Sequence, residues 1–192
     1  MFLSLFSKPL TNSLLSPVSP LRIFRPETAY ERLPLHCACR RNANPDVVQL
    51  LLEAFPHAAV VPDQLGRLPL HYALSNGADP AIINLLLQYS PAAARGVDNH
   101  GWTPLHVACS VGASIETIAL LLHLFPEAVV FRTDKGSTAG GLLMNSAVNK
   151  TLSESYVNTV KEMIRQASID FDQRFVNPLE SEARRAEDLM IV

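Results

Sequence analysis

One tripeptide, Pro-Leu-His, occurs three times in this chain of 192 residues, at a constant step of 35 residues. The three copies begin at Pro34, Pro69 and Pro104. A constant period of this length indicates stacked structural repeats, each too small to bury a hydrophobic face without its neighbour. The repeat therefore predicts an array with a binding surface, but it does not identify what is bound.

The composition is that of an ordinary folded chain. Hydrophobic residues make up 48% and charged residues 18% of the sequence, so extensive disorder is not expected. A net charge of −2 gives no general reason to expect nucleic acid or an anionic membrane as partner. Three cysteines make no disulfide framework, and the sequence has no run of eighteen apolar residues that would span a bilayer. We therefore expect an intracellular monomer, cytoplasmic or nuclear.

The first residues differ from the rest of the chain. Residues 1–26 contain no acidic side chain but carry Lys8, Arg22 and Arg25 among many serines, leucines and prolines. This composition is typical of an organelle transit peptide, and a disordered segment or an end cap is the alternative. We assign residues 1–29 to a targeting or disordered segment.

Each unit predicts two helices. Proline suits the first helical turn, so a short helix is expected after each copy, at Leu35–Arg41, Leu70–Asn76 and Leu105–Val111. Asn44, Asp79 and Ser114 are suited to cap the second helices. Apolar residues at i, i+3 and i+4 give each second helix one face to bury, and these are Val48, Leu51 and Leu52, then Ile83, Leu86 and Leu87, then Ile118, Leu121 and Leu122.

The segments between units predict projecting turns. The second helices should stop before Pro56, Pro91 and Pro126, and an extended segment should follow. That segment ends in Asp63-Gln64-Leu65-Gly66 or Asp98-Asn99-His100-Gly101, where Asp and Gly favour a tight turn. A complete unit is thus a helix, a turn, a second helix and a projecting finger.

The stretch from Asp98 to Ala108 reads Asp-x-x-Gly-x-Thr-Pro-Leu-His-x-Ala. It resembles the ankyrin repeat, and the resemblance covers about Glu31 to Arg165. It implies an all-α solenoid of helix-turn-helix repeats with projecting loops or β-hairpin fingers and a concave face made by fingers and first helices. Leu33 and Leu68 depart from the consensus threonine that Thr103 keeps. Phe-Pro-x-Ala after the second helix marks a divergent subfamily.

The array is expected to span residues 30–168, with units at about 31–65, 66–100, 101–135 and 136–166. The fourth unit lacks the Pro-Leu-His tripeptide, and we interpret it as a degenerate C-terminal cap. Its second helix regains the pattern at Val157, Val160, Met163 and Ile164 if seven residues are inserted, which makes Lys150–Ser155 a lengthened loop. Residues 169–192 form a charged tail, in which Asn177-Pro178 is suited to cap a short helix.

Histidine and cysteine raise a second class of function. His36 with Cys39 and His106 with Cys109 both form His-x-x-Cys, which places the two side chains on one face of a helix. An enzyme or a metal-dependent protein using these pairs is an alternative. However, zinc needs four converging ligands, and the two pairs lie two repeats apart. The resemblance implies that each histidine ties a finger to a neighbouring unit. We expect no catalytic residue, metal or cofactor.

The leading hypothesis is a non-catalytic protein–protein interaction module that binds a protein or peptide on the concave face. Aromatic and arginine side chains are common anchors of such interfaces. Trp102 is the only tryptophan, and its alternative role is to pack between neighbouring fingers. Weak nucleic-acid binding through Arg32, Arg40 and Arg41 is a further alternative, although no nucleic acid is expected. The residues expected to contact the partner are Arg32, Arg40, Arg41, Leu65, Arg67, Tyr72, Asn99, His100 and Trp102.

Overall fold

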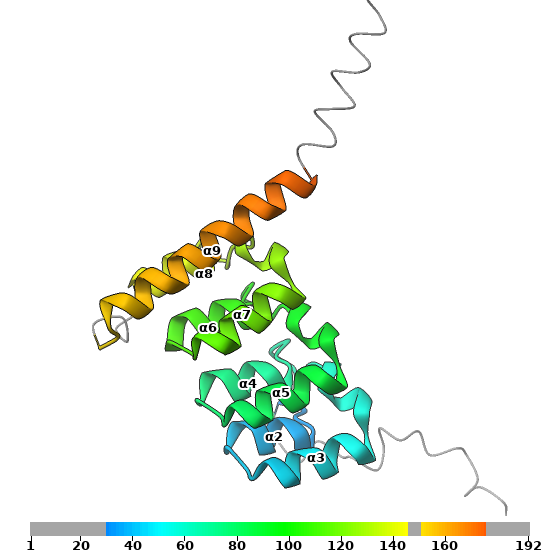
Figure 1. The fold of residues 1–192 in the computed structure, drawn as a ribbon. Coiled ribbons are helices and arrows are strands. Elements are labelled where there is room, and N and C mark those ends of the chain that lie inside the picture. The colour runs from blue at the N-terminus through cyan, green and yellow to red at the C-terminus, as the bar shows by residue number, and fades with distance from the viewer. Residues whose placement is uncertain (1–29, 146–150, 176–192) are drawn as a thin grey trace, which may run out of the picture.

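The structure, a computed structural model, describes residues 30–145 and 151–175. Within these ranges the regular structure is helical and no strand occurs. The helix pairs stack one upon the next, from α2 to α9, so the all-α repeat solenoid is confirmed (Figure 1). The pairs are α2 (Pro34–Arg40) with α3 (Pro45–Ala54), α4 (Pro69–Ser75) with α5 (Pro80–Tyr89), α6 (Pro104–Val111) with α7 (Ile115–Leu124), and α8 (Ala139–Asn145) with α9 (Glu154–Phe175).

The first helix of each of the three regular units begins at the proline of Pro-Leu-His, one residue earlier than predicted. Thr103 accepts a hydrogen bond from the backbone N–H of His106 and so caps α6 with its side chain. Leu33 and Leu68 make no such bond, as their departure from the consensus predicts, and both are buried in the core instead. Gly112 ends α6 in the left-handed conformation, with φ of 68°.

The second helices begin and end where the sequence predicts. The side chains of Asn44, Asp79 and Ser114 each accept a backbone N–H from the first turn of their helix. The predicted apolar faces lie in one continuous core, in which Val48, Leu52, Leu86 and Ile118 are fully or almost fully buried and Leu51 is partly buried. Each helix therefore buries its face against a neighbouring unit, as short amphipathic helices require.

The segment after each second helix differs from the prediction. It begins with a 3-10 helix rather than an extended segment, and the three copies are η1 (Pro56–Val60), η2 (Pro91–Arg95) and η3 (Pro126–Val129). The alanine two positions after each proline explains the difference, because Ala58, Ala93 and Ala128 lie in the core and are at most 3% exposed. A tight helical turn brings these small side chains inward, which an extended segment would not do.

The fingers are tight turns, not β-hairpins, in the part of the chain that the structure describes. In the first finger the N–H of Asp63 donates to the carbonyl of Arg67, and the N–H of Gly66 donates to the carbonyl of Asp63. Neighbouring fingers share one backbone bond, as between the N–H of Asn99 and the carbonyl of Leu65 at 3.0 Å. One bond per pair of fingers is too few for a strand ladder.

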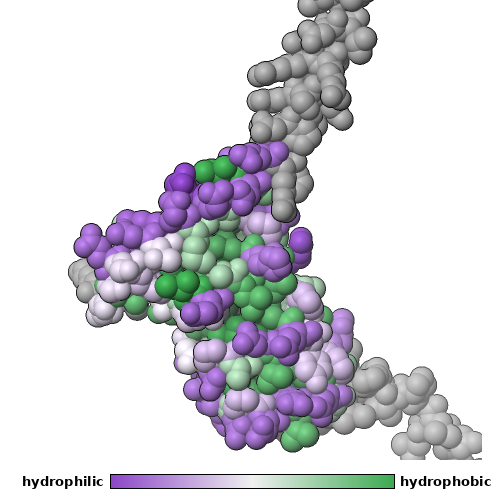
Figure 2. All heavy atoms as spheres, viewed as in Figure 1, coloured by the Kyte–Doolittle hydropathy of each residue, from purple (hydrophilic) through white to green (hydrophobic). Residues whose placement is uncertain are grey.

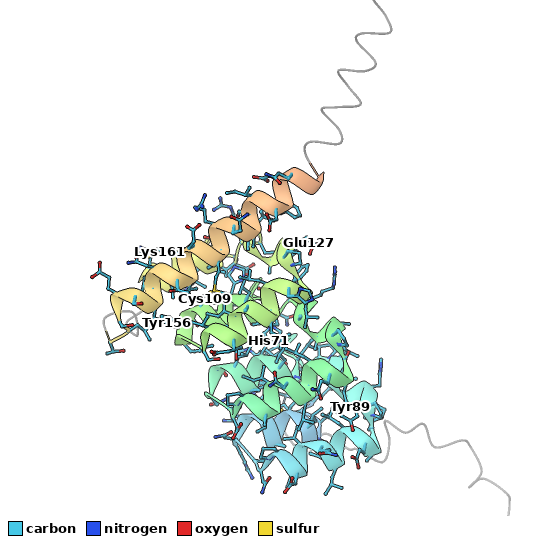
Figure 3. All side chains as sticks on the ribbon, in the orientation of Figure 1. His71, Tyr89, Cys109, Glu127, Tyr156 and Lys161 are labelled. Carbon is cyan, nitrogen blue, oxygen red and sulfur yellow. The ribbon has the colours of Figure 1, made fainter. Side chains whose placement is uncertain are left out.

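The fourth unit ends the array with a longer helix than the first three units have. Helix α9 has 22 residues, begins after the cap Ser153, and continues to Phe175 across the expected array boundary at residue 168. No glycine or proline interrupts it, and exposed side-chain pairs such as Gln166 with Asp170 run along its surface. Val157 and Val160 of α9 are buried. Tyr156 of α9, labelled in Figure 3, donates its hydroxyl to the carbonyl of Ala113.

Three expectations lie outside the described residues: the targeting or disordered segment 1–29, the first part of the lengthened loop at Lys150, and the short helix after Asn177. None of the helices within the described ranges is long and apolar enough to cross a membrane.

Candidate binding surface

The turns and first helices of the units form one surface, which we call the finger face. A buried aspartate organises each of the first two turns. Oδ1 of Asp63 accepts the N–H groups of Leu65 and Arg67, at 2.9 and 3.0 Å. Oδ1 of Asp98 accepts those of His100 and Trp102, both at 2.9 Å. Each carboxylate therefore fixes the direction in which its finger residues project.

The repeated histidines connect the finger face to the helices. The Nδ1 atoms of His36 and His71 accept the N–H groups of Leu33 and Leu68, and their Nε2 atoms lie 3.1 Å from the carbonyls of Arg67 and Trp102 in the next unit. The structural interpretation of these two histidines is thus confirmed. Nδ1 of His106 pairs with Thr103, while its buried Nε2 has no hydrogen-bond partner among the described residues. Burial lowers the pKa of all three imidazoles, which favours the neutral form.

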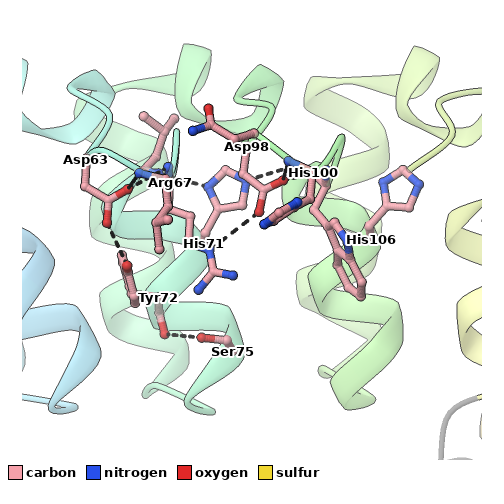
Figure 4. Close-up of polar contacts among 12 residues, drawn as sticks. Asp63, Arg67, His71, Tyr72, Ser75, Asp98, His100 and His106 are labelled. Carbon is pink, nitrogen blue, oxygen red and sulfur yellow. Dashed lines mark hydrogen bonds and ion pairs between the residues drawn. The ribbon is translucent and has the colours of Figure 1, made fainter. Parts of the chain in front are cut away.

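Arg32 and Tyr72 are two of the residues expected to contact a partner, which requires exposed positions, but both are buried, so that expectation is wrong for them. Arg32 is 9% and Tyr72 4% exposed. The Tyr72 hydroxyl donates to Oδ2 of Asp63 at 2.7 Å and accepts from Nε of Arg32 at 3.0 Å. Burial raises the pKa of Tyr72, and the bond to Asp63 adds to this. These three side chains join the first two units and are held within the fold. Figure 4 shows the bond between Tyr72 and Asp63.

Arg67, His100 and Trp102 are brought together around one cavity between α4 and α6, which we call the finger pocket. Its volume is about 180 Å³, and it is lined by Arg67, His71, Ser75, Asp98, His100, Trp102, Val107, Ser110 and Val111. Nε of Arg67 lies 3.5 Å from Oδ2 of Asp98, and the Arg67 side chain remains 39% exposed (Figure 4). The pocket therefore combines a half-exposed cation, a buried carboxylate and apolar walls.

The other expected contact residues lie apart from the finger pocket. Asn99 is exposed, and its side-chain amide donates to the carbonyl of Gln64 in the neighbouring finger at 2.9 Å. Leu65 is half-buried beside it. Arg40 and Arg41 are exposed at the end of α2. Because Arg32 is buried against Asp63, the three arginines do not form one exposed basic patch, which weakens the nucleic-acid alternative.

Sequence reasoning omitted two important positions of this pocket, Val107 and Asp98. The sequence pattern identifies Asp98 only as a turn residue, although its second oxygen faces Arg67. The sequence did carry a signal for Val107, because it stands 35 residues after Tyr72 and replaces that aromatic with a smaller side chain. The interpretation of Trp102 as packing between fingers and its role as a pocket wall are both compatible with its half-buried position.

The His-x-x-Cys pairs lie in the interior. Cys39 and Cys109 are fully buried, and burial raises the pKa of each thiol to about 12. A thiol with so high a pKa is neither a good nucleophile nor a ready metal ligand. In residues 30–145 and 151–175 no group of three or more His, Cys, Asp or Glu side chains is placed to hold a metal ion.

A larger cavity, of about 380 Å³, lies between α7 and α9. Its walls are mainly apolar, and include Leu122, Met163 and Phe171. Hydrophobic residues are exposed on this side of the molecule below the polar outer surface of α9 (Figure 2). We place the candidate site at the smaller finger pocket, because charged and aromatic side chains converge there on one space.

The stacked helix pairs, turn aspartates and inter-unit histidines agree with the result of comparing the sequence with models of known protein families. The family model described as ankyrin repeats (3 copies) matches residues 12–92 and 35–134, which together span more than half of the chain. The chain belongs to the ankyrin-repeat family. Ankyrin repeats generally mediate protein–protein interactions, and the family is typically non-enzymatic. No curated protein matches this ankyrin-repeat chain.

Proposed function

We propose that this ankyrin-repeat protein is a monomeric, non-catalytic interaction module that binds a protein or peptide on the concave face of the array, here the finger face. The observation that carries the proposal is the convergence of Arg67, His100 and Trp102 on the finger pocket. Tryptophan and arginine beside a partly apolar pocket are the side chains that most often dominate protein interfaces.

The state of the polar groups supports binding rather than catalysis. The thiols of Cys39 and Cys109 are buried, and so are the imidazoles of His36, His71 and His106. The scaffold satisfies both ring nitrogens of His36 and of His71, whereas Nε2 of His106 has no hydrogen-bond partner among the described residues. The accessible groups of the finger pocket are a guanidinium, an imidazole and an indole, with two serine hydroxyls at its edge. Such groups recognise a ligand by hydrogen bonds, charge and stacking.

The test compares the proteins that the full chain and its variants retain from a cell extract, identified by mass spectrometry. Trp102→Ala should weaken the affinity for the retained partner by about 2 kcal/mol or more, as loss of a central anchor does. His100→Ala is a second variant that spares the core, because its side chain is 63% exposed. Leu50→Ala is the matched control, since Leu50 is 64% exposed on α3, away from the finger pocket.

Equal retention of every partner by the wild type, His100→Ala and Trp102→Ala would refute the proposal. If Leu50→Ala is the only variant that loses a partner, the interface lies on the second helices instead of the finger face. The helix content of each variant, measured by circular dichroism, shows whether the fold is retained.

A further inference from the structure

The contact between the first two units contains a filled aromatic site. Tyr72 projects from α4, and its ring lies edge-on to the ring of His36, with centroids 6.1 Å apart. Its hydroxyl donates to Oδ2 of Asp63 at 2.7 Å and accepts from Nε of Arg32 at 3.0 Å. The guanidinium carbon of Arg32 lies 5.1 Å from the ring centroid. Arg32, His36 and Asp63 thus form a receptor for one phenol group.

The same receptor recurs 35 residues later without its phenol. Arg67, His71 and Asp98 stand at the positions that follow Arg32, His36 and Asp63, and Val107 stands at the position that follows Tyr72. All four of these residues line the finger pocket. Since the repeats share one backbone geometry, the pocket lies where the ring of Tyr72 lies in the preceding unit.

The polar groups of this second receptor have the same arrangement. Oδ1 of Asp98 accepts two turn N–H groups, as Oδ1 of Asp63 does. Oδ2 of Asp98, in a side chain only 4% exposed, faces Nε of Arg67 at 3.5 Å. Among the described residues no hydroxyl donates to it as Tyr72 donates to Asp63. The Arg67 side chain is 39% exposed, whereas that of Arg32 is 10% exposed. A buried acceptor and an accessible donor therefore both face the open space.

We propose that the finger pocket binds the side chain of a tyrosine from the partner protein. The hydroxyl donates to Oδ2 of Asp98 and accepts from Nε of Arg67, while the ring lies against Trp102 and Val107. The proposal rests on the proposed function and names the chemistry recognised at that same site. A volume of about 180 Å³ suits one side chain, since pockets for small-molecule ligands are roughly 300–1,000 Å³.

The chain does not supply this tyrosine itself. Its four tyrosines are Tyr30, Tyr72, Tyr89 and Tyr156, all of them within the described residues, and none lines the pocket. The segments 1–29, 146–150 and 176–192 contain no tyrosine. The tyrosine must also be unmodified, because a phosphate on its hydroxyl would place negative charge against the buried Asp98 carboxylate.

The test titrates the full-length protein with N-acetyl-tyrosinamide and follows the indole N–H of Trp102 and the methyl groups of Val107 and Val111 by NMR. The expected result is saturable shifts of these signals, with binding about tenfold weaker for N-acetyl-phenylalaninamide, which lacks the hydroxyl. The O-phosphotyrosine amide should cause no shift. Equal binding of the tyrosine and phenylalanine amides, or no shift with either, would overturn the proposal.

Val107→Tyr should fill the pocket from within, as Tyr72 does one unit earlier, and abolish binding of N-acetyl-tyrosinamide while keeping the fold. Val130→Tyr is the matched control, because Val130 is 47% exposed outside the pocket. If His100→Ala and Trp102→Ala weaken partner capture but the tyrosine amide never binds, the proposed function stands and the tyrosine inference fails. If the amide binds and Val107→Tyr leaves partner capture unchanged, a partner tyrosine is not the occupant.

Discussion

Nε of Arg32 donates a 3.0 Å hydrogen bond to the hydroxyl of Tyr72, a residue forty positions later in the chain. The same hydroxyl donates to Asp63, so one phenol joins a residue ahead of α2, a turn aspartate and helix α4. All three side chains are buried. A buried hydrogen-bond network of this kind fixes one relative arrangement of two units, because any other arrangement leaves polar groups unpaired.

Tyr72→Phe tests this network. The variant keeps the ring but removes the hydroxyl, so Oδ2 of Asp63 loses its 2.7 Å donor and keeps the longer contact to Arg32 at 3.4 Å. We expect the free energy of unfolding to fall by about 1–3 kcal/mol, the cost of leaving a buried polar group unpaired. Urea denaturation followed by circular dichroism measures it. Tyr89→Phe is the control, since Tyr89 is 37% exposed and should change stability by less than about 0.5 kcal/mol.

The buried histidines predict that stability falls in mild acid. Burial lowers the pKa of His36, His71 and His106 below 6.5, while the unfolded chain takes up protons at its ordinary pKa. The unfolded state therefore binds more protons below about pH 6.5, and the free energy of unfolding decreases as the pH drops through that value. Asp63, whose pKa is also lowered, adds to the loss only below its ordinary value of 3.8. Urea midpoints measured between about pH 7.5 and pH 5 should decrease.

His71→Gln should make this decrease smaller, because one of the three groups that resist protonation is gone. His123→Gln, at an exposed position on α7, should leave it unchanged. Urea midpoints that stay constant from neutral pH to about pH 5 in the wild type would contradict the assignment.

The helices of this fold were predictable because they depend on local chemistry. Proline at the first turn, capping side chains such as Asp79, and apolar residues at helical spacing are all features of neighbouring residues. The 3-10 helices were missed, although Ala58 and its equivalents Ala93 and Ala128 carried the signal. An alanine after proline is compatible with an extended strand too, and only the core that receives it decides.

The finger face was harder to predict because its contacts cross between units. The 35-residue period shows which positions correspond, but it does not show that Arg32 meets Tyr72 or that Arg67 meets Asp98. These contacts depend on the residues that break the repeat. Tyr72 closes one site, and Val107 leaves the corresponding site open one unit later. The contact residues expected from the repeat therefore include both pocket residues, such as Trp102, and buried residues of the scaffold, such as Tyr72.

The cysteines predict an unequal response to alkylation. Cys39 and Cys109 are fully buried, with the pKa raised to about 12, whereas Cys37 is half-buried. Iodoacetamide should modify Cys37 in the native protein and the other two only after unfolding, because the thiolate is the reactive form and must be reached by solvent. Mass spectrometry after timed labelling counts the modified thiols. Cys37→Ser should lack the fast reaction, and rapid native labelling of Cys109 would contradict the burial of the repeats.

The turn glycines allow backbone strain and crowding to be separated. Gly66 and Gly136 have nearly the same left-handed conformation, with φ of 73° and 76°. A Cβ atom at Gly66 would lie 2.5 Å from Oδ1 and 2.8 Å from the backbone nitrogen of Asn99 in the next finger, whereas a Cβ at Gly136 meets nothing within 4 Å. Gly136→Ala should therefore cost only the backbone strain of about 1–2 kcal/mol. Gly66→Ala should cost about 1–3 kcal/mol more, since the first two fingers must move apart.

Thermal or urea unfolding of the two variants gives the difference directly. Asn99→Ala in the Gly66→Ala background should recover part of the loss, because it removes the side-chain oxygen from the crowded position while the backbone contact remains. The same second substitution in the Gly136→Ala background should recover nothing, since a Cβ atom at Gly136 does not contact Asn99. Equal destabilisation by Gly66→Ala and Gly136→Ala would mean that the first two fingers are not in contact, and the continuous finger face that holds the pocket would then be interrupted.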